Sequence, residues 1–79
     1  MFKNKNADGT LNLCKNNIVK LRKAKNLSQR ALADQLQLAG IDLNKNAIQQ
    51  IESGKRFVTD IELRAIANFF NVAIDDLVD

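Results

Sequence analysis

A cluster of amide side chains and one lysine lies in the segment NKNAIQQIESGKR, residues 44–56. On a helical wheel Ile48 and Ile51 share one side, and the polar residues project away from it. These polar residues are Lys45, Asn46, Gln49 and Gln50. Amides can hydrogen-bond in pairs to the N6 and N7 edge of adenine, and lysine can donate to guanine O6 and N7. The composition suits a helix that reads base edges in a major groove, although some amide-rich helices only face water.

Residue types that most enzymes and metal sites need are missing from the chain. It has no histidine, and Cys14 is its one cysteine. A zinc cluster, an intramolecular disulfide and the histidine-dependent nucleophilic sets therefore cannot form. Asp34, Glu52 and Asp60 fall on different predicted helices, without a spacing that pairs them. We therefore expect no enzyme activity, no catalytic residue, no metal and no cofactor.

The net charge of +3 conceals an uneven distribution along the chain. Residues 1–56 hold eleven basic residues against four acids, a balance of +7, and residues 57–79 hold one against five, a balance of −4. A polyanion such as nucleic acid would be attracted to the first portion and repelled by the second. The total of +3 alone does not distinguish a DNA-binding protein from an ordinary basic one.

Length and composition indicate one small helical domain. The chain has 79 residues, 46% of them hydrophobic, with no proline, tryptophan or tyrosine. It lacks the alternation of β-branched and aromatic residues that strands show. No apolar run is long enough for a membrane span or a signal peptide. We expect a soluble, cytoplasmic protein, associated with the nucleoid when it binds DNA.

Capping signals and apolar spacing predict the positions of five helices after an N-terminal arm. Residues 1–15 carry no sustained periodicity and are predicted to form a flexible arm, with an ordered turn that ends near Lys15 as the alternative. Lys3 and Lys5 of such an arm could also lie along a DNA groove. The first helix begins near Asn17. Ser28, Asn44 and the Thr59 capping box begin the next three, and a short fifth helix occupies residues 71–79.

Three segments of the sequence resemble those of a known family. LSQRALA, AIQQIESGKR and LRAIANFFNVAIDDL occur in the order found in the xenobiotic-response-element helix-turn-helix family, which includes phage Cro and repressor proteins. The chain strongly resembles this family over about residues 16–78. The resemblance implies an all-α, five-helix, lambda-repressor-like domain over residues 16–79. The third helix of such a domain enters the major groove.

The resemblance also assigns roles to individual residues. The predicted base-reading residues are Lys45, Asn46, Gln49 and Gln50. The predicted phosphate contacts are Gln29, Asn44, Lys55 and Arg56, of which Arg56 could instead simply face water. Arg22 and Glu52 match a pair that usually forms an ion pair between the first and third helices.

Two features depart from the family pattern. The connection QLAGIDLN between the second and third helices is longer than usual, and we expect Ile41 and Leu43 to insert into the core. Ala73 stands where serine or threonine often caps the last helix. The longer connection affects the angle at which the third helix would meet DNA.

These observations predict a sequence-specific DNA-binding transcriptional regulator, a repressor that occupies a palindromic operator as a homodimer. The expected dimer surface lies on the last two helices and consists of Phe70, Val72, Ile74 and Leu77. We expect no membrane partner and no small-molecule ligand. The alternative is a protein-binding module, such as an antitoxin or an antagonist of another regulator, that uses the same fold.

Overall fold

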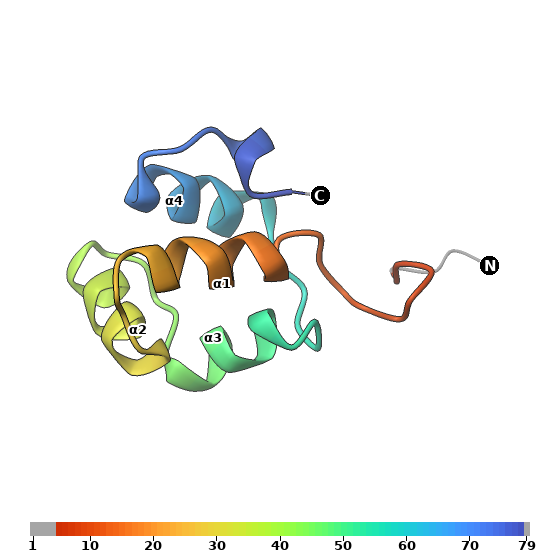
Figure 1. The fold of residues 1–79 in the computed structure, drawn as a ribbon, viewed down its shortest axis with the longest axis horizontal. Helices are drawn as coiled ribbons and strands as arrows, with labels where there is room; N and C mark the ends of the chain where they lie inside the picture. Colours follow the sequence, from red (N-terminus) through yellow and green to blue (C-terminus); the bar gives the residue numbers. More distant parts are fainter. Residues whose placement is uncertain (1–4, 79) are drawn as a thin grey trace.

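Four α-helices and one 3₁₀ turn make up the computed structural model, which describes residues 5–78 (Figure 1). The elements are α1 (Lys15–Ala24), α2 (Gln29–Leu38), α3 (Lys45–Glu52), α4 (Asp60–Phe70) and the 3₁₀ turn η1 (Ile74–Asp76). α1 runs across the middle of the molecule, with α2 and α3 on one side and α4 and η1 on the other. The part of the chain described contains no strand, so the all-α prediction is confirmed.

The count of five helices is not confirmed. Where a fifth helix was expected, η1 is a single turn held by bonds from Asp76 N to Ala73 O (3.0 Å) and from Leu77 N to Ile74 O (2.9 Å). Ala73 has no side-chain oxygen to cap a longer helix. α4 ends at Phe70 and is followed by Asn71, whose φ of 57° lies in the left-handed region that commonly stops a helix.

Local hydrogen bonds explain where three helices begin. Ser28 Oγ accepts from Ala31 N at 3.0 Å, and Asn44 Oδ1 accepts from Ala47 N at 2.8 Å. The Thr59 hydroxyl accepts from Glu62 N, and the Glu62 carboxylate accepts in return from Thr59 N at 3.1 Å. Each cap satisfies an amide that the helix itself leaves without a partner. The three predicted caps are therefore confirmed.

Among residues 5–78, twelve apolar side chains form the core. They are Cys14, Ile18, Leu32, Ala33, Leu36, Leu43, Ile48, Ile51, Ile66, Ala67, Phe70 and Leu77. Leu43 comes from the long α2–α3 connection and is 1% exposed, and Ile41 of the same connection is partly buried against this core. The expectation that these two residues insert into the core is confirmed.

The described residues before α1 form an ordered turn, which was the alternative to the expected flexible arm. Leu11 N donates to Gly54 O at 2.8 Å, and Asn12 Nδ2 donates to Ile51 O in α3 and to Arg56 O in the loop after it. α1 already begins at Lys15, two residues before the predicted start. Lys3 lies outside the described residues. No helix within residues 5–78 is both long and apolar enough to cross a membrane.

Candidate nucleic-acid interface

One face of α3 is exposed and polar along its whole length. The four predicted base-reading residues are all exposed, and they are Lys45, Asn46, Gln49 and Gln50. On the opposite face Ile48 and Ile51 are 1% and 0% exposed. The hydrogen-bonding groups of this helix therefore point outward, and its apolar residues anchor it to the core.

Glu52 connects α3 to the two helices before it. Arg22 Nε on α1 lies 2.7 Å from Glu52 Oε2, and Arg22 Nη2 donates to Glu52 Oε1 at 3.0 Å. Gln29 Nε2, in the first turn of α2, donates to the same Oε1 at 2.9 Å. The side chains of Arg22 and Glu52 are only 12% and 7% exposed. One carboxylate thus fixes α3 relative to α1 and α2.

The residues predicted to contact phosphate differ in their exposure and in their hydrogen-bond partners. Lys55 is exposed just past α3, and Asn44 is exposed at its start, where its Oδ1 serves as the helix cap. The side chain of Gln29 is partly buried and donates to Glu52. These three residues lie around the ends of α2 and α3.

Arg56 is held by another residue of the chain. Its Nη1 and Nη2 each donate to a carboxylate oxygen of Glu62 at 3.0 Å, and Nη1 also donates to Phe57 O at 2.8 Å. The hydrogen bonds from Arg56 lower the pKa of Glu62 from its ordinary value, and Glu62 in turn raises the pKa of Arg56. The guanidinium therefore ties the loop after α3 to the first turn of α4.

The chain leaves α3 through a tight left-handed turn. Lys55 N donates to Gln50 O at 2.9 Å, and Gly54 N donates to Ile51 O at 3.1 Å. This pair of bonds is the Schellman motif, which needs a positive φ at the residue after the cap. Gly54 supplies it with a φ of 79°. The turn fixes the direction in which Lys55 leaves the helix.

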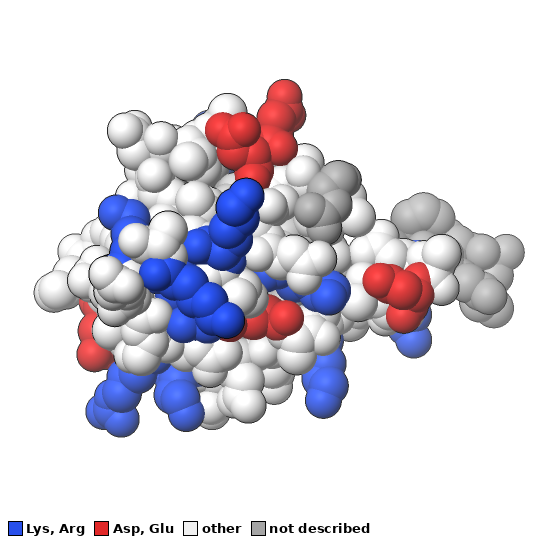
Figure 2. Space-filling view, in the orientation of Figure 1, with Lys and Arg blue, Asp and Glu red and all other residues white. Residues whose placement is uncertain are grey.

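Basic side chains predominate over part of the surface. In Figure 2, lysine and arginine gather over the middle and lower parts of the face shown, where α1, α2 and α3 lie in Figure 1. Acidic side chains stand at the top, at the position of η1, and others lie in the centre, at the lower left and on the right of the view. The distribution follows the charge balance along the sequence and would favour approach of a polyanion from the α3 side.

The four residues of the expected dimer surface do not lie together on the outside. Phe70 and Leu77 are 7% and 0% exposed because they pack in the core of the single chain. They therefore cannot provide a surface for a second copy. Ile74 is 40% exposed, and Val72 is partly buried against the core.

Two residues make contacts in this region that were not predicted from the sequence. Asn12 bonds to carbonyls 39 and 44 positions away, and Glu62 holds Arg56 in addition to its role in the capping box. The Glu62 contact could have been suggested by the opposite charges six positions apart. Asn12 sits in a segment without periodicity, and no local signal marks it.

A helix with an outward polar face, locked against the helix that precedes it in the chain, defines a helix-turn-helix DNA-binding domain. The chain belongs to the helix-turn-helix family of the Cro/C1 type, since the profile HTH_3, described as "Helix-turn-helix", matches residues 18–77. Proteins of this family are generally not enzymes.

A curated relative carries the same segment. The chain is 41% identical over 58 residues to the "HTH-type transcriptional activator BcrR" of Enterococcus faecalis. The match covers 73% of this chain and 26% of the relative, so the chain spans about a quarter of that protein's length. No solved structure matches the chain significantly.

Proposed function

We propose that this chain is a sequence-specific DNA-binding transcriptional regulator that inserts α3 into the major groove. The observation that supports it is the exposed row of one lysine and three amides on α3, a helix anchored by two buried isoleucines. In this proposal Lys45, Asn46 and Gln50 contact base edges, with Gln49 beside them. Their donors and acceptors match the patterns that adenine and guanine present in the major groove.

Backbone phosphates are contacted by groups at the helix ends. Lys55 supplies a charge past the end of α3, Asn44 lies at its start, and the first turn of α2 offers its amides beside Gln29. Arg56 has its guanidinium on Glu62 and contributes by holding the loop in place. Phosphate contacts of this kind set the register of α3 in the groove without reading sequence.

The proposed regulator binds as a homodimer to a palindromic operator and represses by occupying it. Two copies related by a twofold axis would place their α3 helices about 34 Å apart, one turn of the duplex. Val72 and Ile74 are the members of the expected dimer surface that the chain leaves accessible. The named relative is an activator. Activation requires contact with the transcription machinery in addition to DNA, whereas occupancy requires DNA binding alone.

Selection of binding sites from a random duplex pool tests the proposal. The wild-type chain, Gln50→Ala and the control Gln37→Ala would be compared at near-physiological salt. Gln37 is an exposed glutamine near the end of α2, so its replacement makes the same chemical change away from α3. We expect a palindromic consensus whose preference at one position per half-site relaxes in Gln50→Ala alone.

Recovery of no consensus from the wild-type chain would refute DNA reading and favour the protein-binding alternative. The dimer is tested separately by light scattering with and without the selected duplex. Ile74→Asp should weaken the dimer, while Leu38→Asp, at a residue that is 89% exposed on α2, should leave it intact. Equal dimerisation of both variants would contradict a surface that includes Ile74.

A further inference from the structure

The segment of residues 6–14, which we name the N-terminal latch, is fastened to the end of α3. Leu11 N donates to Gly54 O at 2.8 Å. Within the latch, Asn6 Nδ2 donates to Thr10 Oγ1 at 2.8 Å and to Asn12 O at 3.0 Å. The latch is therefore a folded turn with its own hydrogen bonds, and it continues directly into α1.

Asn12 makes the main connection between the latch and α3. It is 8% exposed, and its Nδ2 donates to Ile51 O at 3.1 Å and to Arg56 O at 2.9 Å. Its Oδ1 accepts from Cys14 N at 3.1 Å. Both the nitrogen and the oxygen of this side chain therefore have hydrogen-bond partners inside the protein, as a buried polar group requires.

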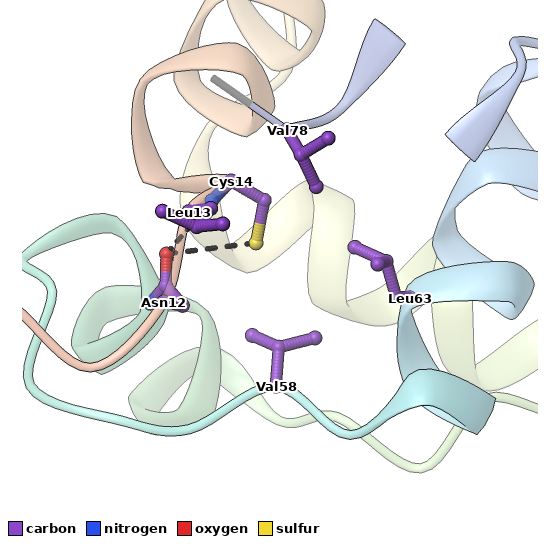
Figure 3. A pocket seen from close by; sticks show the side chains of 6 residues that line it. All are labelled: Asn12, Leu13, Cys14, Val58, Leu63 and Val78. Carbon is purple, nitrogen blue, oxygen red and sulfur yellow. Dashed lines mark hydrogen bonds between the residues drawn. The ribbon is translucent and has the colours of Figure 1, made fainter. Parts of the chain in front are cut away.

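Asn12 lies beside a largely apolar pocket. Figure 3 shows it at the edge of a pocket of about 210 Å³, with its oxygen directed toward the Cys14 sulfur. The other side chains that line the pocket are apolar apart from that thiol, and they are Leu13, Cys14, Val58, Leu63 and Val78. The Asn12 amide donates away from this apolar lining, to Ile51 O in the last turn of α3 and to Arg56 O in the loop that follows.

Thr10 and Gly54 pack against each other at the same place. A Cβ added to Gly54 would lie 2.7 Å from Thr10 Cγ2 and 3.0 Å from Thr10 Cβ. Gly54 is thus required twice, by its left-handed φ of 79° and by the closeness of the latch. The latch is seated directly on the turn that follows α3.

Lys55 stands between the two residues that the latch holds. The carbonyl of Gly54 accepts from Leu11 N, and the carbonyl of Arg56 accepts from Asn12 Nδ2. The amide of Lys55 itself bonds to Gln50 O. α3 has only eight residues, too few to be stable without tertiary contacts, so its end depends on such neighbours.

We propose that Asn12 is a positioning residue for DNA binding, which holds the end of α3 so that Lys55 meets a backbone phosphate. The inference rests on the proposed function, and it extends the DNA-binding unit beyond the two helices to the segment before α1. Asn12 touches no DNA in this proposal. It acts through Lys55, so replacing Asn12 should weaken DNA binding in the same way as neutralising the Lys55 charge.

The test is a double-mutant cycle on operator affinity as a function of salt. It uses Asn12→Ala, Lys55→Gln and the two changes combined, with Asn68→Ala as the control because Asn68 is an exposed asparagine on α4. Loss of one phosphate contact lowers the slope of log affinity against log salt by about 0.9, or about 3.5-fold in affinity across a fourfold change in salt. We expect the slope to fall by this amount in Asn12→Ala and in Lys55→Gln. The combined variant should show no further decrease in slope.

Additive effects in the cycle, or an unchanged salt slope in Asn12→Ala, would overturn the proposal and leave Asn12 a purely structural role. If Asn12→Ala does not fold, Asn6→Ala replaces it, since this partly exposed side chain supports the latch from outside the core. That variant should show a smaller loss in the same direction.

Amide hydrogen exchange separates failure of this proposal from failure of the proposed function. Exchange at Lys55 N should quicken in the latch variant, while exchange at the core amide of Leu32 should not. If the wild-type chain binds no DNA, the proposed function fails and with it the role of Lys55, whatever the exchange shows. If DNA is bound and Lys55 N exchanges no faster in the variant, the latch does not hold the end of α3.

Discussion

Replacing Arg22 by methionine would isolate the contribution of the buried ion pair to stability. The guanidinium donates twice to Glu52 and once to Leu27 O at 2.8 Å. In Arg22→Met, Glu52 keeps only the bond from Gln29, although its side chain is 7% exposed. Breaking a buried pair by removing one partner costs about 3–5 kcal/mol, because the other charge remains buried.

The remaining bond from Gln29 places the expected cost of Arg22→Met at the lower end, about 3 kcal/mol. A chain of 79 residues has a total stability of about 4–12 kcal/mol, so the variant loses a large share of it. The corresponding fall in melting temperature is about 12–24 °C for a domain of this size. Replacing both partners, as Arg22→Met with Glu52→Met, should return stability to within about 1 kcal/mol of wild type.

Urea unfolding followed by helical circular dichroism measures these differences, with the slope m checked for constancy. Lys23→Met is the matched control, since it removes a positive charge from an exposed neighbour on the same helix. It should change stability by less than about 0.5 kcal/mol. A loss below about 1 kcal/mol in Arg22→Met, or a double variant as unstable as the single one, would refute the reasoning.

Three further changes probe other parts of the fold. Gly54→Ala should destabilise by at least about 1–2 kcal/mol in urea unfolding, because it strains the left-handed turn and meets Thr10, and a neutral result would contradict the close approach. Ser28→Ala should cost about 1 kcal/mol in the same assay, whereas no loss would mean that the α2 cap contributes nothing. The pKa of Glu62 is lowered by Arg56, so its stabilisation is present above the ordinary pKa of 4.5 and is lost as pH falls through the lower folded value. Glu62→Gln should therefore be less stable than wild type at pH 7, with a difference that narrows on acidification, and parallel pH profiles would exclude this linkage.

The starts of three helices were predictable because their signals are local. Ser28, Asn44 and Thr59 each cap an amide three positions along the chain, so the residue and its partner lie in one short stretch of sequence. The two faces of α3 were predictable for a similar reason, since helical periodicity separates Ile48 and Ile51 from the amides. The DNA contacts assigned to the exposed side chains remain predictions.

What could not be predicted depends on contacts between distant segments. Asn12 reaches Ile51 O, 39 positions away, and its own segment has no periodic pattern. Phe70 and Leu77 were expected on a dimer surface because a helical wheel shows an apolar face but not what covers it. In the structure the turn η1 brings Leu77 back onto the core of its own chain, where it is fully buried.

The sharing of Glu52 among three helices has a consequence for how association would proceed. A carboxylate that binds groups from α1 and α2 restricts the rotation of α3 before any duplex arrives. The conformational entropy of α3 is therefore lost during folding, and little further loss is left for the encounter with DNA. Binding by such a preassembled unit would show a heat-capacity change that reflects the contact surface alone, without the large additional term that accompanies coupled folding.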